Sequence, residues 1–385
     1  MRKIRVLVVD DAVVVRKIVT EILTEDPDIE VVGVAANGRI ALAKISQLSP
    51  DIVTLDVEMP EMDGIETLAA LRKTHPKLPV IMFSTLTERG ASATLDALSR
   101  GANDYVTKPA NVGSVAAGLD RVRTDLLPKI KSLCPGLGAG DPSYRGTRAS
   151  GPAQGPFPAG KSAGADAKSR RPNPPQRIDA LVIGVSTGGP NALAAMLASF
   201  PASLAIPVLI VQHMPPMFTR MLAERLSATC SIPVTEAGDG EKLSAGRAWI
   251  APGNFHMEVA RSGPGVRIVT HQGPHENSCR PAVDVLFRSA VSVYGPHVLG
   301  VVLTGMGQDG YVGCQTIHGA GGQCLAQDEK SSVVWGMPGI VARSGLADAV
   351  LPLEEMAGEI VRRVQRFRPL SSLALSCHLP LKQAG

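Results

Sequence analysis

Residues 4–11 read IRVLVVDD, an apolar and largely β-branched run that ends in two aspartates. Such a run is typical of a strand that is buried on both faces of a sheet. Similar runs recur along the first third of the chain, and stretches with helical periodicity separate them. We expect strands at 4–9, 29–35, 52–55, 80–83 and 104–106, and helices at 13–25, 38–48, 64–74, 90–100 and 112–125. Five strands alternating with five helices predict an α/β fold with a doubly wound parallel sheet.

Charged and hydroxyl side chains follow the ends of four of these strands. They are Asp10 and Asp11, Asp56, Ser84 or Thr85, and Lys108. The carboxyl ends of parallel strands meet at one edge of a sheet, so the three aspartates would converge and repel one another. Mg²⁺ resolves such a conflict, because it prefers oxygen ligands. With the metal and Lys108 neutralising charge, Asp56 could accept a phosphoryl group; the alternative is an acidic patch without chemistry.

The sequence around these residues resembles that of response-regulator receiver domains over residues 4 to about 125. The matching motifs are VVDD at 8–11, LDVEMPEMDG at 55–64, FST at 83–85 and YVTKP at 105–109. The resemblance implies that Asp56 is the phosphoacceptor and that a sensor histidine kinase is the phosphodonor. By the same resemblance, Mg²⁺ would be bound by Asp10, Asp11, Asp56 and the Glu58 backbone carbonyl. Ser84 and Tyr105 would be the switch residues, and Lys108 would contact the phosphoryl group.

A basic segment rich in glycine and proline follows. Residues 131–177 hold eight Gly, eight Pro, eight Lys or Arg and two Asp, so this segment carries more positive charge than the net +4 of the whole chain. It has too few large apolar side chains to offset its ordering entropy, which predicts a flexible linker. We therefore expect a receiver domain at 1–127, a linker at 128–177, a second domain at 178–368 and a tail at 369–385.

The second domain opens with an apolar run at 180–185, then Ser186-Thr-Gly-Gly-Pro190 and a helical stretch at 191–199. The frame Gly184-x-Ser186-x-Gly188 at a strand-to-helix turn resembles a nucleophile elbow, in which a serine hydroxyl stands exposed above a sheet. A glycine-rich turn capped by a serine is the alternative.

A serine nucleophile needs a base and an acid partner. His213 follows the apolar run at 207–211, and Asp309 follows the run at 298–304, so both should lie at the same strand edge as Ser186. His256 is the rival base, and we expect it on the substrate side of the site. Asp239 and Asp284 are rival acids, but neither follows so apolar a run.

The stretch from Gly305 to Gly310 also spells the dinucleotide-binding pattern G-x-G-x-x-G, and Asp328 lies near the spacing of a ribose contact. A dinucleotide-binding domain is thus an alternative for the second half. Against it, Asp309 would repel a pyrophosphate, and the pattern comes late in the domain rather than in the first strand-to-helix turn.

GVSTGGP at 184–190, QHMP at 212–215, APG…HM at 251–257 and TGMGQDG at 304–310 together resemble the catalytic domain of chemotaxis protein-glutamate methylesterases. Receiver, linker and this Rossmann-like domain match the CheB architecture. The resemblance implies demethylation of glutamate methyl esters on methyl-accepting chemoreceptors, with deamidation of glutamines, by Ser186, His213 and Asp309 and with no cofactor at the esterase site. The N–H groups of Thr187 and Met306 are candidates for the oxyanion hole. The alternative is a phospho-switched binding module without catalysis.

Composition excludes several other classes. Aromatic residues make up 3% of the chain, which argues against a stacking platform for nucleic acid. No apolar run reaches the length of about 18 residues needed to span a membrane. The six cysteines show no CxxC spacing, which argues against a structural zinc site and for a reducing compartment. We expect a cytoplasmic monomer that neither binds nucleic acid nor inserts into a membrane.

Overall fold

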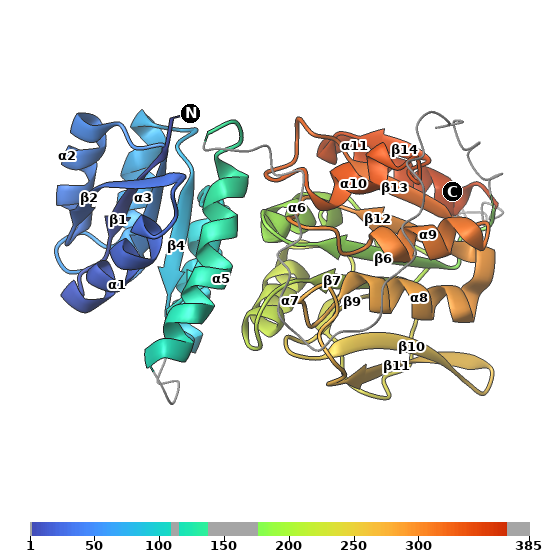
Figure 1. Ribbon diagram of the computed structural model, residues 1–385. Helices are drawn as coiled ribbons and strands as arrows, with labels where there is room; N and C mark the ends of the chain where they lie inside the picture. Colours follow the sequence, from blue (N-terminus) through green and yellow to red (C-terminus); the bar gives the residue numbers. More distant parts are fainter. Residues whose placement is uncertain (1, 109–114, 138–175, 368–385) are drawn as a thin grey trace, which may run out of the picture.

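The computed structural model describes residues 2–108, 115–137 and 176–367. Its first domain is a five-stranded parallel sheet in the order β2-β1-β3-β4-β5, covered by helices on both faces (Figure 1). The strands are β1 (Ile4–Val9), β2 (Ile29–Ala35), β3 (Ile52–Asp56), β4 (Val80–Ser84) and β5 (Asp104–Thr107). The helices are α1 (Val13–Thr24), α2 (Gly38–Leu48), α3 (Gly64–Thr74), α4 (Glu88–Ser99) and α5 (Val115–Leu133). The predicted doubly wound fold is confirmed for this half.

The last helix of the first domain is longer than the sequence suggested. We placed the end of the domain at residue 127, but α5 continues to Leu133. Ile130 is fully buried against the sheet, and Lys131 pairs with Asp26 and Asp28 in the loop before β2. These contacts outweigh Pro128 inside the helix. The Gly/Pro-rich linker prediction otherwise falls largely on 138–175, outside the described residues, as does the tail at 369–385.

The second domain is a seven-stranded parallel sheet in the order β14-β13-β12-β6-β7-β9-β8. Its strands are β6 (Ala180–Val185), β7 (Val208–Gln212), β8 (Val234–Glu236), β9 (Ala248–Ile250), β12 (Val298–Val302), β13 (Gln323–Gln327) and β14 (Ala349–Leu351). Helices α6 (Gly189–Leu197), α7 (Phe218–Thr229), α8 (Val283–Tyr294), α9 (Tyr311–Gly319), α10 (Met337–Arg343) and α11 (Leu353–Gln365), with the short η1 (Gly295–His297), complete it. The predicted Rossmann-like architecture is confirmed.

One feature of this domain was not predicted. The strands β10 (His256–Ser262) and β11 (Gly265–His271) form a separate antiparallel hairpin below the sheet in Figure 1. The hairpin packs against α8 through buried residues such as Met257 and Ile268.

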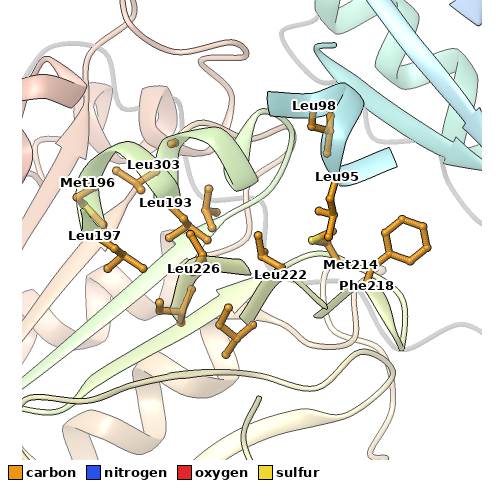
Figure 2. Packing of buried hydrophobic residues seen from close by; sticks show 14 of the residues in the cluster. Leu95, Leu98, Leu193, Met196, Leu197, Met214, Phe218, Leu222, Leu226 and Leu303 are labelled. Carbon is orange, nitrogen blue, oxygen red and sulfur yellow. The ribbon is translucent and has the colours of Figure 1, made fainter. Parts of the chain in front are cut away.

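The two domains share a continuous hydrophobic cluster. Helix α4 of the first domain packs against α6 and α7 of the second, and Figure 2 shows Leu95 and Leu98 of α4 facing leucines of those helices. At the margin, Arg225 Nη1 lies 3.0 Å from Asp96 Oδ1 and its Nη2 donates to Ser99 Oγ at 2.8 Å. The face of the second domain that α6 and α7 form is therefore held next to the first domain.

Among the described residues, no helix combines the length and apolarity that crossing a membrane requires.

Candidate active site

The first domain gathers three carboxylates at the carboxyl edge of its sheet. Ligand oxygens of Asp10, Asp11 and Asp56 lie within 4.8 Å of one another. Lys108 Nζ lies 2.8 Å from Asp10 Oδ2 and 2.7 Å from Asp56 Oδ2, so one ammonium group faces three carboxylates. Burial raises the pKa of Asp56 to about 6, although a hydrogen bond from Lys108 opposes the rise. This all-oxygen set suits Mg²⁺, which would supply the missing positive charge.

Of the two predicted switch residues, Ser84 contacts the start of α4 and Tyr105 contacts the second domain. The Ser84 hydroxyl donates to the carbonyls of Gly90 and Thr85, at 3.0 and 3.3 Å. Tyr105 is buried, and its ring stacks on Phe218 of α7 with the centroids 4.8 Å apart. An aromatic side chain of the first domain thus forms part of the contact with the second domain.

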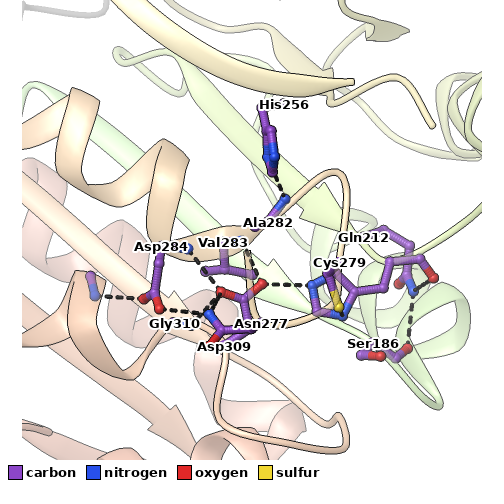
Figure 3. Close-up of polar contacts among 12 residues, drawn as sticks. Ser186, Gln212, His256, Asn277, Cys279, Ala282, Val283, Asp284, Asp309 and Gly310 are labelled. Atoms are coloured by element: carbon purple, nitrogen blue, oxygen red, sulfur yellow. Dashed lines mark hydrogen bonds and ion pairs between the residues drawn. The ribbon is translucent and has the colours of Figure 1, made fainter. Parts of the chain in front are cut away.

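In the second domain, Ser186 stands where β6 ends and α6 is about to begin. Gly188 has a φ of 78°, which lets the chain turn sharply into the helix. Gly184 is required by packing, since a Cβ there would lie 2.4 Å from Val283 Cγ1. Gln212, which the sequence analysis did not single out, donates from Nε2 to the Ser186 carbonyl at 3.0 Å (Figure 3). The turn that carries Ser186 is thereby held by packing against Val283 and by the hydrogen bond from Gln212.

His213 lies beside this turn because β6 and β7 are neighbours. Val185 and Gln212 are partners in the parallel pairing, so Ser186 and His213 follow at the same edge. His213 Nε2 lies 2.8 Å from Asp309 Oδ2. An ionised carboxylate can only accept, so Nε2 carries a proton, and Nδ1 can accept one when the imidazole is neutral. Ser186 and His213 make no hydrogen bond to each other within the described residues; such bonds often form only with substrate bound.

Asp309 is 2% exposed and is surrounded by donors. Its carboxylate accepts hydrogen bonds from the backbone N–H groups of Val283, Asp284 and Gly310, and from Asn277 Nδ2 (Figure 3). Burial alone would raise the pKa of Asp309, but the imidazole and these donors hold it below its ordinary value. An ionised carboxylate therefore faces His213.

The rival acids do not contact the imidazole. Asp284 binds the Gly313 N–H and Asn277, and burial together with the Asp309 charge raises its pKa to about 6. Asp239 accepts from the Thr270 N–H at an exposed position. Of the three candidates, Asp309 is the one that meets His213.

The structure differs from our expectation for His256. We placed this residue on the substrate side, but it is 1% exposed at the start of β10. Its Nε2 bonds to the Pro274 carbonyl at 2.9 Å, and its Nδ1 accepts from the Ala282 N–H at 3.2 Å. Burial lowers the pKa of His256. Both nitrogens are thus used by backbone groups, and the ring fastens the hairpin to the start of α8.

The two backbone groups proposed for an oxyanion hole lie on adjoining loops. Ser186 N donates to the carbonyl of Thr304, which brings the Thr187 turn next to the Met306 loop. Within the described residues, neither the Thr187 nor the Met306 N–H has a hydrogen-bond acceptor. The Met306 loop is held by Gly305, which forms a parallel bridge with Trp335.

The dinucleotide alternative fits this geometry poorly. In the G-x-G-x-x-G stretch, the position that a pyrophosphate would approach is filled by the Asp309 carboxylate and its donors. Asp328 is engaged within its own loop, where it accepts from the N–H and hydroxyl of Ser331.

Cys279 is a member of the site that the sequence analysis missed. Its Sγ lies 3.7 Å from His213 Nδ1, on the ring nitrogen that Asp309 does not use. The sequence carried no signal for this contact, because 66 positions separate the two residues and no ligand-like spacing surrounds the cysteine.

The first domain contacts the residue that follows Ser186. The Thr187 hydroxyl donates to Asp104 Oδ2 at 2.6 Å in a buried contact, and Asp104 is also paired with Lys129. Asn191 of α6 donates to the Leu98 carbonyl at 2.7 Å. One wall of the Ser186 turn is therefore formed by the receiver-like domain.

Each half of the chain matches a known protein family. Residues 6–119 match the response regulator receiver domain, and residues 181–360 match the CheB methylesterase family. A protein-glutamate methylesterase/protein-glutamine glutaminase of Trichodesmium erythraeum is 54% identical over 94% of this chain and all of its own length. The chain belongs to the CheB methylesterase family.

Further members of the CheB family are similar at comparable levels. The enzyme of the same name from Nocardioides is 54% identical over 96% of this chain and 98% of its own length. The crystal structure of the Thermotoga maritima CheB methylesterase catalytic domain is 38% identical, with a TM-score of 0.48, and covers 49% of this chain and 99% of its own. The resemblance on which the sequence analysis relied is confirmed.

Proposed function

We propose that this chain is a phosphorylation-regulated serine hydrolase that demethylates glutamate methyl esters, and deamidates glutamines, on chemoreceptors. The observation that carries the proposal is the His213–Asp309 hydrogen bond at the strand edge where Ser186 follows β6. The names of the relatives, protein-glutamate methylesterase/protein-glutamine glutaminase, supply the substrate class. Both reactions are acyl transfers, so one site serves both.

In this mechanism Ser186 Oγ attacks the side-chain carbonyl of the receptor glutamate. His213 Nδ1 takes the hydroxyl proton, while Asp309 holds the Nε2–H and stabilises the imidazolium. The imidazolium returns the proton to the departing methoxide, which leaves as methanol. His213 then activates a water that hydrolyses the acyl-enzyme. Serine, imidazole and carboxylate suffice for these steps, and the mechanism requires no cofactor at this site.

The negative oxygen of the tetrahedral intermediate needs donors. The N–H groups of Thr187 and Met306 are our candidates, because both are without an acceptor in the described residues and lie on the two loops that flank Ser186. A donor of this kind typically contributes about 3–4 kcal/mol to transition-state stabilisation.

The test is methanol release from a methylated chemoreceptor. Ser186→Ala should reduce turnover by several orders of magnitude and leave the fold intact, since it removes one oxygen from a partly exposed turn. Ser199→Ala, at an exposed position after α6, is the matched control and should behave as wild type. Methanol release by Ser186→Ala at the wild-type rate would refute the nucleophile and leave the phospho-switched binding module as the better description.

We propose that the first domain restrains this reaction until Asp56 is phosphorylated by a sensor histidine kinase. Asp10, Asp11, Asp56 and the Glu58 carbonyl would hold Mg²⁺, and Lys108 would pair with the phosphoryl group. Support comes from two contacts between the domains, namely the Thr187–Asp104 hydrogen bond at the Ser186 turn and the stacking of Tyr105 on Phe218 of α7. A shift of Tyr105 would change that stacking contact directly.

A further inference from the structure

Cys279 and His213 form a pair in which the imidazole lies between two groups. Asp309 Oδ2 is 2.8 Å from Nε2, and Cys279 Sγ is 3.7 Å from Nδ1. The ligand atoms of these three residues all lie within 4.8 Å of one another. Cys279 and His213 are both partly exposed, so a small ion can reach them from solvent.

The turn that carries Cys279 is rigidly held. Glu276 and Cys279 exchange two backbone hydrogen bonds, at 2.8 and 3.1 Å, and the two residues between them, Asn277 and Ser278, have φ angles of 51° and 62°. Arg288 binds both carboxylate oxygens of Glu276, at 2.6 and 2.7 Å. The thiol is thus presented to the imidazole by a fixed frame.

The distances match chelation of zinc by the thiolate and the imidazole. With bond lengths of about 2.3 Å to sulfur and about 2.05 Å to nitrogen, a tetrahedral ion separates the two ligand atoms by about 3.6 Å. The observed Sγ–Nδ1 distance is 3.7 Å.

Asp309 is suited to support such an ion rather than to bind it. When one tetrahedral zinc ion binds a nitrogen and an oxygen, the two ligand atoms lie about 3.4 Å apart. His213 Nε2 and Asp309 Oδ2 are only 2.8 Å apart, so this pair suits a hydrogen bond and not a shared metal ion. Asp309 also keeps its backbone donors. A carboxylate that accepts the second N–H of a zinc-bound histidine fixes the ring and strengthens the ligand.

We propose that His213 Nδ1 and Cys279 Sγ form a binding site for Zn²⁺, and that zinc bound there inhibits the enzyme reversibly. On binding, the thiol proton of Cys279 passes to solvent and a zinc–thiolate bond forms. Waters complete the coordination. The ion then occupies Nδ1, the nitrogen that must accept the Ser186 proton. The inhibitory part rests on the proposed function, whereas the binding part does not.

Binding is tested first without reference to activity, on full-length Ser186→Ala protein with Co²⁺ as the probe in thiol-free buffer. A Cys279–Co²⁺ bond produces thiolate-to-metal charge-transfer absorption. Co²⁺ in the carboxylate set of the first domain produces none, because all ligands there are oxygens, and excess Mg²⁺ competes for that set. We expect the band in Ser186→Ala and in Ser186→Ala/Cys230→Ala, and its loss in Ser186→Ala/Cys279→Ala. Cys230 is the matched control, a partly exposed thiol outside the cluster.

Inhibition is then measured as methanol release against Zn²⁺ concentration, each variant relative to its own zinc-free rate. The Cys279→Ala variant should need at least about tenfold more zinc than wild type for half-inhibition. Cys230→Ala should match wild type, and a chelator should restore activity.

A missing charge-transfer band in Ser186→Ala protein would overturn the site, and so would a band that survives Cys279→Ala. Equal zinc sensitivity of wild type and Cys279→Ala, or activation by zinc, would overturn the inhibitory role. If instead the cobalt band behaves as expected while no variant releases methanol, the zinc site stands and the proposed function fails.

Discussion

At the scale of single residues, the site depends on how His213 is oriented. The imidazole is held at Nε2 by Asp309, and Asp309 is in turn held by three backbone N–H groups and one side-chain amide. In the neutral imidazole these bonds leave Nδ1 as the acceptor. In the proposed mechanism the carboxylate therefore determines which ring nitrogen takes the Ser186 proton.

This orientation makes Asp309→Asn a sensitive probe. We expect kcat for methanol release to fall roughly 10³–10⁴-fold, because an amide neither stabilises the imidazolium nor enforces the correct tautomer. Asp239→Asn is the control, since Asp239 lies at an exposed position and binds a backbone N–H away from His213. An Asp309→Asn enzyme within tenfold of wild type would contradict the assigned role.

Sequence reasoning found residues that follow apolar strands, and it missed those whose position depends on loops. Ser186, His213 and Asp309 each end or follow a strand of one parallel sheet, so topology alone brings them to one edge. Cys279 lies on a turn between the hairpin and α8, and the periodicity of the strands does not predict the position of such a turn. The burial of His256 was missed for the same reason, because the hairpin that buries it was not predicted.

At the scale of elements, close packing of β6 against α8 positions the turn that carries Ser186. Gly184 leaves no room for a side chain, since an added Cβ would lie 2.4 Å from Val283 Cγ1. The N–H of Val283 also binds Asp309, so the same helix start supports both the strand and the acid.

This contact predicts coupling between two substitutions. Gly184→Ala should lower the free energy of unfolding by about 1–3 kcal/mol through overpacking, and Val283→Ala should lower it by removing buried methyl groups. The double variant should lose less than the sum, because the second change makes room for the first. Denaturant titrations of the four proteins test this, and strictly additive losses would contradict it.

Strand and helix positions were largely predictable, and element ends were less so. The first five strands begin where we predicted, and the three central strands, β1, β3 and β4, are buried almost throughout, which demands a nearly continuous apolar sequence. The end of α5 was misjudged, because its last turns are stabilised by tertiary contacts of Ile130 and Lys131 rather than by local composition.

At the scale of the whole molecule, the contact between the domains combines an apolar centre with polar margins. Leu95 and Leu98 supply the centre, and Arg225 with Asp96 lies at the margin (Figure 2). The contact reaches the catalytic turn through Thr187. We therefore expect docking of the first domain to reduce the access of substrate to Ser186.

This opposition predicts a charge-dependent basal activity. Arg225→Asp places two carboxylates side by side at the margin and should raise the methylesterase rate of unphosphorylated full-length protein by up to about fivefold. The swapped pair Arg225→Asp/Asp96→Arg restores attraction and should return the rate to near wild type. Equal basal rates in all three proteins would indicate that docking does not limit the reaction.

The bridge between Gly305 and Trp335 has a practical consequence. The chain contains two tryptophans; Trp249 is fully buried within the second domain, whereas Trp335 is only partly buried. Its neighbour Val334 packs in a cluster that includes side chains of the first domain. Separation of the domains would leave the surroundings of Trp249 unchanged and would expose Val334, which directly precedes Trp335, to water. The intrinsic fluorescence of Trp335 should therefore change when the domains separate, and no attached label is needed to follow that step.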